Sequence, residues 1–77
     1  MEIHLHLYSI LRDKLPEEAK GKADLELEDE ATLADLLQRL EISRRVVVSI
    51  NGDHVSDRSH RLQEGDEVKL FSSISGG

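Results

Sequence analysis

The sequence contains no cysteine. This excludes a disulfide framework, a zinc site built on thiolates and a catalytic cysteine, so any sulfur chemistry must use a group other than a side-chain thiol. Proline occurs once, and the aromatic residues are one tyrosine and one phenylalanine. The sequence also has no long apolar run, and its N-terminus lacks the charged and then apolar pattern of a signal peptide. We therefore expect a cytoplasmic protein with no membrane partner.

The chain has 77 residues and a formal net charge of −6. A domain of this size buries only about 60% of the surface that its unfolded chain exposes, which argues against a self-sufficient enzyme. An acidic chain repels phosphate backbones, so no nucleic-acid partner is predicted. Four arginines are interrupted by acids and predict no basic stripe: Arg44, Arg45, Arg58 and Arg61. The net charge either favours a partner with a basic docking surface or only keeps the domain soluble.

Alternation of apolar and polar residues predicts the strands. Residues 1–8 and 23–27 alternate, so each forms a strand with one buried face. Residues 9–15 have a roughly helical spacing that Pro16 ends. This connection is too short for a crossover helix, so the first two strands pair antiparallel. A strand at 46–50 precedes Asn51-Gly52, which indicates a type I′ hairpin turn to a short strand at 54–55. The last strand covers 67–71.

One helix is predicted between the second and third strands. Thr32 is its N-cap, and Asp35 occupies the capping-box position. Four leucines at i, i+3, i+4 and i+7 form a single apolar stripe: Leu33, Leu36, Leu37 and Leu40. The order of elements predicts an α+β fold of the β-grasp (ubiquitin-like) type. In it, a mixed sheet of four to five strands packs on one main helix, with a short helix after the first strand.

After the last predicted strand the chain reads Ser72, Ser73, Ile74, Ser75, Gly76 and Gly77. Glycine and serine favour neither strand pairing nor packing, so we predict a flexible tail at 72–77 beyond a domain at 1–71. A terminal Gly-Gly arises by chance in roughly 0.5% of chains at average glycine usage. A partner's channel can close around glycine backbone and admit the C-terminal carboxylate. ATP can activate such a carboxylate as an acyl-adenylate, so Gly77, preceded by Gly76, is the predicted reactive residue.

These features together resemble the MoaD and ThiS family of ubiquitin-like sulfur carriers, and the resemblance covers essentially the whole chain. It rests on the β-grasp order, Asn51-Gly52, the segment Leu62…Gly65-Asp66-Glu67-Val68 and the Gly76-Gly77 ending. The long connection at 9–21 resembles the small subunit of molybdopterin synthase (MoaD) more than the thiamine carrier ThiS, whose chains turn back quickly. One feature departs from MoaD, because Ser72 and Ser73 stand where MoaD-like tails have two prolines.

The resemblance implies that the chain is a co-substrate that donates sulfur and has no catalytic side chains of its own. A ubiquitin-activating-type enzyme would use ATP to adenylate Gly77, and a sulfur donor would convert it to a thiocarboxylate. The large subunit of molybdopterin synthase would then use this sulfur to build a dithiolene on a pterin precursor in molybdenum cofactor biosynthesis. No cofactor bound to the chain itself is expected.

The two aromatic residues are predicted to lie on the face of the sheet that is opposite the helix. If the alternating aliphatic residues of the first and last strands face the helix, Tyr8 and Phe71 face away from it. His54 does so too, if Val55 points inward. Exposed aromatic residues are typical of a docking patch, although a bulge or a covering loop would also explain them. By resemblance, Phe71 and Tyr8 line the partner-binding face, which is predicted to continue into the tail at 72–75.

Two further groups of residues resemble sites. His4 and His6 share one strand face, as metal ligands can, but no carboxylate completes a ligand set and no metal is predicted. Asp66 and Glu67 are interpreted as turn and solvation residues.

Three alternatives to the MoaD-type carrier remain open. The first is a ThiS-like carrier for thiamine thiazole or another pathway. The second is a ubiquitin-like modifier that is conjugated through Gly77 to lysines. The third is a β-grasp binding module with an incidental diglycine.

Overall fold

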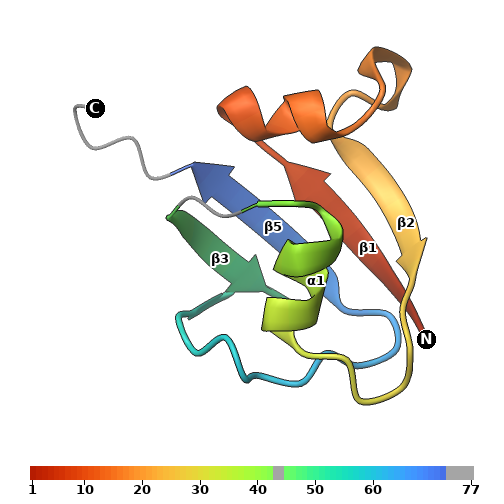
Figure 1. The fold of residues 1–77 in the computed structure, drawn as a ribbon, viewed down its shortest axis with the longest axis vertical. Coiled ribbons are helices and arrows are strands. Elements are labelled where there is room, and N and C mark those ends of the chain that lie inside the picture. The colour runs from red at the N-terminus through yellow and green to blue at the C-terminus, as the bar shows by residue number, and fades with distance from the viewer. Residues whose placement is uncertain (43–44, 73–77) are drawn as a thin grey trace.

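A computed structural model describes residues 1–42 and 45–72, with the side chains of 9 and 10 left out. Its five-stranded sheet packs on one α-helix (Figure 1). The strands are β1 (Glu2–Leu7), β2 (Lys22–Glu26), β3 (Val46–Ile50), β4 (Asp53–Val55) and β5 (Glu67–Ser72). The helix α1 spans Leu33–Arg39, and two 3₁₀ helices, η1 (Ser9–Lys14) and η2 (Glu17–Ala19), connect β1 to β2. This is the predicted α+β, β-grasp arrangement.

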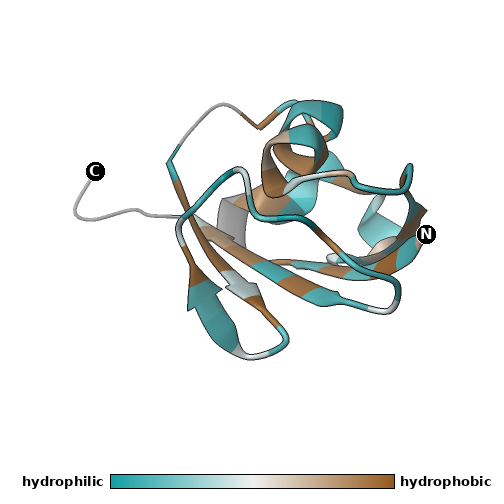
Figure 2. Ribbon diagram, turned by 90° about the horizontal axis from the view of Figure 1, so that it is seen from below, coloured by the Kyte–Doolittle hydropathy of each residue, from teal (hydrophilic) through white to brown (hydrophobic). Residues whose placement is uncertain are grey.

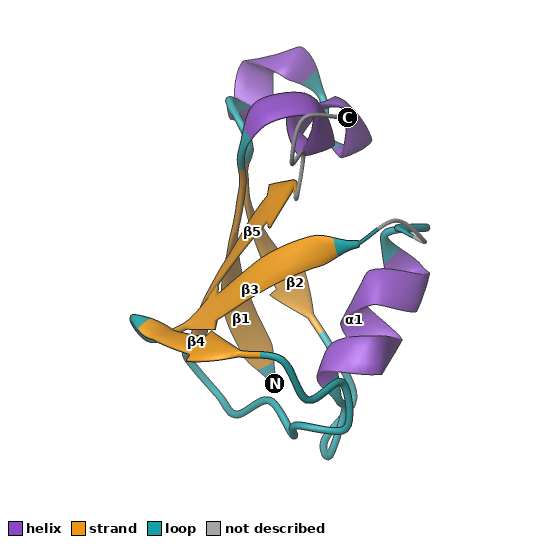
Figure 3. Ribbon diagram, turned by 90° about the vertical axis from the view of Figure 1, so that its left-hand side faces the viewer, coloured by secondary structure: helices purple, strands orange, loops and turns teal. Residues whose placement is uncertain are grey.

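The sheet is mixed, and its strand order is β2-β1-β5-β3-β4. β1 pairs antiparallel with β2, as predicted, and parallel with β5 at the centre of the sheet. β5 also pairs antiparallel with β3. The first and last strands therefore lie side by side, and β5 ends at the same end of the sheet as η1 (Figure 3). The chain continues from this end of the sheet into the predicted tail.

Alternation along the strands separates two faces of the sheet. One face packs against α1 and is lined by buried aliphatic side chains: Ile3, Leu5, Leu7, Val48, Ile50, Val68 and Leu70. The buried leucines of the predicted helix stripe, Leu33, Leu36 and Leu37, meet them from α1. Hydrophobic and hydrophilic residues accordingly alternate along the strands in Figure 2. No described element covers the opposite face, which we call the open face (Figure 3).

The N-terminus of α1 is fixed by both predicted and unpredicted contacts. The capping box is confirmed: Thr32 Oγ1 accepts from the Asp35 N–H at 3.2 Å, and Asp35 Oδ2 accepts from the Thr32 N–H at 2.9 Å. The next two free N–H groups, of Leu33 and Ala34, donate to carbonyls of the loop between β4 and β5. The loop thereby holds α1 in place over the sheet.

The predicted hairpin turn is confirmed, since φ is 52° at Asn51 and 88° at Gly52. A buried carboxylate supports it. Asp66 Oδ1 accepts from Asn51 Nδ2 at 2.9 Å, and Asp66 Oδ2 accepts from the Gln63 N–H at 2.8 Å. Asp66 is a turn residue, as predicted, but only 6% of it is exposed, so it ties two turns together rather than solvating the surface.

The C-terminal boundary of the last strand differs from the prediction. β5 runs one residue further than 67–71, because Ser72 pairs with Val46 of β3. Ser72 therefore belongs to the sheet and not to the tail. In the described part of the chain, no helix is both long enough and apolar enough to cross a bilayer.

Candidate functional site

The two aromatic side chains of the chain lie against each other on the open face. The rings of Tyr8 and Phe71 stack with centroids 4.6 Å apart and an angle of 9° between their planes. Both side chains are only half-buried. Stacking of this kind fixes two large apolar surfaces in one orientation while leaving them accessible. The predicted placement of both rings away from the helix therefore agrees with the structure.

The backbone holds Tyr8 in position at the end of β1. Its N–H donates to the carbonyl of Leu70 at 3.1 Å, which extends the β1–β5 pairing by one residue. Its own carbonyl accepts from the Leu11 N–H at 3.1 Å and so begins η1. The extended conformation at Tyr8 (φ −119°, ψ 156°) places its side chain next to Phe71. The short 3₁₀ helix after β1 is thus part of what positions the aromatic pair.

A valine enlarges this pair into a patch. Val47 of β3 is the cross-strand neighbour of Phe71, and 40% of it is exposed. It is the only exposed large hydrophobic residue among those described. We call Tyr8, Phe71 and Val47 the apolar patch. Val47 is not among the residues predicted from the sequence, although its place in Val46-Val47-Val48 puts it out of phase with two core-facing residues.

The apolar patch lies at the base of the predicted tail. Phe71 comes directly before Ser72, the last described residue, whose side chain is half-buried. The predicted reactive residues Gly76 and Gly77 lie outside the described residues, as do the predicted contact residues Ser73, Ile74 and Ser75.

The predicted site residue His54 lies apart from the apolar patch. It is exposed on β4, at the edge of the sheet, and pairs with Ser49 of β3. Ser49 in turn pairs with Lys69 of β5, which places His54 in a different cross-strand row from Phe71. The structure therefore brings Tyr8 and Phe71 together and leaves His54 out of the patch.

The two histidines of β1 have separate neighbours. His6 Nδ1 lies 3.3 Å from the hydroxyl oxygen of Tyr8, beside the apolar patch. His4 Nδ1 lies 2.7 Å from Asp24 Oδ1 across the β1–β2 pair. This hydrogen bond raises the pKa of His4 above its usual 6.5, and the charges of Asp24, Glu2 and Glu67 add to the effect. Among the described residues, no three histidine or acidic side chains converge as metal ligands would.

Charged residues on the open face are sorted by sign into rows. Next to the apolar patch, His6 is the cross-strand neighbour of Lys22 on one side and Lys69 on the other. We call these three residues the basic row. One row further from the patch, His4 lies between Asp24 and Glu67. We call Asp24, His4 and Glu67 the acidic row. The sequence predicted no basic stripe, because Lys22 and Lys69 come from two distant strands and meet on either side of His6 only through the register of the sheet.

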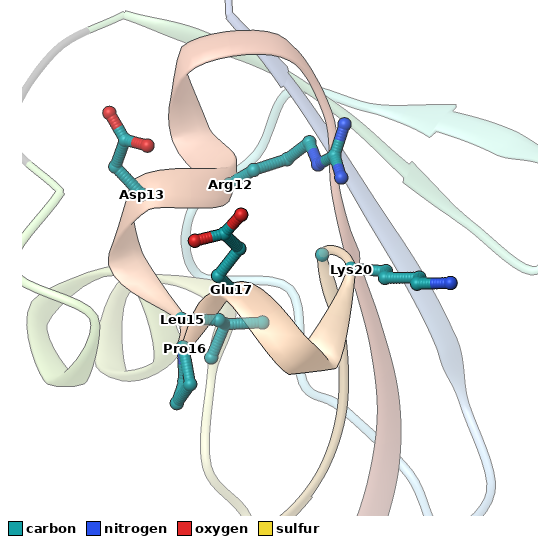
Figure 4. A pocket seen from close by; sticks show the side chains of 7 residues that line it. Arg12, Asp13, Leu15, Pro16, Glu17 and Lys20 are labelled. Atoms are coloured by element: carbon teal, nitrogen blue, oxygen red, sulfur yellow. The ribbon is translucent and has the colours of Figure 1, made fainter.

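The basic row continues into a hollow at the end of β1. The hollow has a volume of about 340 Å³ and is lined by His6, Leu7, Tyr8, Arg12, Lys20, Gly21 and Lys22. Gly21 lines the hollow, and only glycine fits at this position. Its φ is +79°, and a Cβ there would lie 2.5 Å from the Leu7 carbonyl oxygen. In Figure 4, Arg12 and Lys20 extend toward the same side, whereas Asp13 points away from them. Glu17, which lines the adjoining hollow with them, lies between Asp13 and Lys20 in this view.

The fold and the apolar patch at the end of the central strand define a ubiquitin-like β-grasp protein. The sequence model of the ThiS family matches residues 11–77. The chain therefore belongs to the ThiS family, the class of ubiquitin-like sulfur carriers that the sequence resembles. No curated protein matches the sequence at a significant level.

Solved structures with the same fold include three informative neighbours. A Pyrococcus furiosus protein assigned as subunit 1 of molybdopterin converting factor has a TM-score of 0.76 and 19% identity, over 96% of this chain and 99% of that chain. SAMP1, a modifier protein of Haloferax volcanii, has a TM-score of 0.71 and 19% identity over both full chains. In a complex of subunits 1 and 2 of molybdopterin-converting factor from Helicobacter pylori, the matching chain has a TM-score of 0.63 and 16% identity over both full chains.

Proposed function

We propose that the chain is the sulfur-carrying small subunit of a molybdopterin synthase-type complex. In the first step, the Gly77 carboxylate attacks the α-phosphate of ATP on an adenylating enzyme, forming an acyl-adenylate and releasing pyrophosphate. A sulfide equivalent from a donor enzyme then attacks the carbonyl carbon. The C–S bond forms, AMP leaves with the bridging oxygen, and the proton on sulfur passes to water. The resulting thiocarboxylate is the sulfur donor for dithiolene formation.

The observation that carries the proposal is the position of the stacked Tyr8–Phe71 pair. In an 8.7 kDa domain with only two aromatic residues, both are only half-buried and lie next to the start of the predicted tail. Folding alone favours full burial of such side chains, so their incomplete burial supports a docking role. A large subunit that binds the apolar patch would hold the tail in its own active site, where proximity accelerates the sulfur transfer. The chain itself contributes no catalytic side chain.

Two further observations favour the molybdopterin pathway over a ThiS-like role. The connection from β1 to β2 contains η1 and η2, as the resemblance to MoaD implies. Two of the structural neighbours carry molybdopterin-converting names. The discriminating measurement is which purified large enzyme, a molybdopterin synthase subunit or a thiazole synthase, binds the apolar patch.

The direct test is the intact mass of the protein after incubation with ATP, an adenylating enzyme and a sulfur source. We expect a gain equal to sulfur replacing one oxygen, localised to Gly77 by fragmentation. The matched control lacks Gly76 and Gly77 and should show no gain and an unchanged melting temperature. An unchanged mass with an enzyme that is active on another carrier would contradict the proposal.

A second candidate function is a protein modifier, which the fold similarity to SAMP1 favours. It predicts higher-mass conjugates in cell extracts that disappear when Gly77 is deleted. Conjugates without any thiocarboxylate would replace the carrier proposal with this one.

A further inference from the structure

We propose that the basic row and the hollow at the end of β1 bind carboxylates on the surface of the partner protein that docks on the apolar patch. This inference rests on the proposed function, because it specifies the chemistry of that same partner at the edge of the contact. The partner would present an apolar centre flanked by aspartate or glutamate side chains.

Four cations are concentrated at one place on the surface. Lys22 and Lys69 flank His6 in the cross-strand register, and Arg12 and Lys20 approach from η1 and from the turn before β2. No acidic residue lines this hollow, whereas Asp13 and Glu17 line the neighbouring hollow that shares Arg12 and Lys20 with it. In a chain with 16 acidic and 10 basic residues, such a grouping is not expected from composition.

These cations have no ion-pair partner among the described residues. The ion pairs of the described chain join the N-terminal amino group to Asp29, His4 to Asp24, and Arg61 to Glu30. None of them involves Arg12, Lys20, Lys22 or Lys69. The positive charge of the basic row and the hollow is therefore available to an external anion.

The combination of apolar and basic groups on this surface fits a protein partner. The apolar patch adjoins the basic row through the His6–Tyr8 contact, with ring centroids 6.2 Å apart, so one surface can engage both. Proteins offer such a mixture of apolar and carboxylate groups, whereas a nucleic acid offers a continuous line of phosphates. The acidic row, with Asp24 and Glu67, would repel that line one row away.

The net charge of −6 does not oppose local binding of carboxylates. At physiological ionic strength, exposed charges further apart than a Debye length of about 8 Å are largely screened from one another. The sign of the charge within the contact therefore decides its complementarity. The inference therefore favours the second interpretation of the net charge, in which it keeps the domain soluble, over a partner with a basic docking surface.

The test is a binding titration with purified large subunit and, separately, purified adenylating enzyme encoded in the same genome. The double variant Lys22→Glu/Lys69→Glu is compared with Arg45→Glu/Arg58→Glu, which has the same net charge but changes exposed residues beside α1. At low salt we expect the first variant to bind the large subunit about 10-fold or more weakly, and the second to stay within about two-fold of wild type. The loss should shrink as salt increases.

Each outcome has a definite meaning. Equal losses for the two variants would overturn the inference and leave the proposed function standing. If the wild-type chain binds neither enzyme, the proposed function fails, and the inference fails with it. Titration with a single-stranded oligonucleotide should show no binding, and binding that the Lys22→Glu/Lys69→Glu variant loses would reassign the surface to nucleic acid. Thermal melting of both variants verifies that they are folded.

Discussion

On β5, Val68 and Leu70 are buried against α1, while Lys69 and Phe71, which alternate with them, lie on the open face. The two faces of this strand share one backbone and one pattern of hydrogen bonds. They differ in what determines their side chains. The buried face must fill a core, whereas the open face carries residues that the core does not require.

The comparison extends over the whole sheet. The strand residues that are buried against α1 are aliphatic, as hydrophobic burial requires. The open face changes from the apolar patch to the basic row and then to the acidic row over three cross-strand rows. Burial of the core does not determine which side chains stand on the open face. Their arrangement in rows of one chemical kind therefore points to function.

The largest expected effect is on the buried face. Leu70→Ala should lower the free energy of unfolding by about 2–5 kcal/mol, because it removes core contacts and leaves a cavity. Its neighbour on the open face, Lys69→Ala, should change it by less than about 0.5 kcal/mol. Urea unfolding of the two variants measures the difference, and similar losses would contradict the division into two faces.

The next effect comes from the buried carboxylate between the turns. Asp66→Ala leaves Asn51 Nδ2 and the Gln63 N–H without their acceptor, which should cost roughly 1–3 kcal/mol of stability. Glu67→Ala, at the adjacent exposed position, is the control. We expect it to unfold at nearly the wild-type urea concentration. A loss of stability as large as that of Asp66→Ala would contradict the conclusion that the buried carboxylate stabilises the two turns.

Phe71→Ala should separate folding from binding. Loss of the stacked pair with Tyr8 should cost about 0.5–1.5 kcal/mol of stability. Binding to the large subunit should weaken by about 2 kcal/mol or more, as for a central aromatic anchor. Unfolding curves and binding isotherms on the same preparation measure both, with Ser49→Ala as the open-face control. A large stability loss with unchanged affinity would place Phe71 in the core.

The smallest effect is a pH dependence in the acidic row. The Asp24 hydrogen bond raises the pKa of His4 in the folded state above 6.5. The folded state then binds the proton more tightly than the unfolded state, so the stabilisation is fully present below about pH 6.5 and disappears as pH rises through the folded pKa. Melting temperatures measured across this range should show a small decrease that is reduced in Asp24→Asn, where only the charges of Glu2 and Glu67 remain. A decrease of the same size in Asp24→Asn would assign it to another group.

Much of the fold could be predicted because its signals are local. The alternation in β1 and β5, the leucine stripe of α1, the Thr32–Asp35 capping box and the Asn51-Gly52 turn each depend on residues within a few positions of one another. Strand parity also placed Tyr8 and Phe71 on the same face. The sequence itself therefore determined the β-grasp order, the core and the aromatic pair.

The tertiary structure decided what depends on register between distant strands. It places Lys22 and Lys69 on either side of His6, buries Asp66 against Asn51, and puts His54 in a row away from Phe71. A shift of one residue in the pairing would move each of these side chains to another neighbour or to the other face. Register is fixed by the packing of the whole sheet on α1, so no local pattern in the sequence contains it.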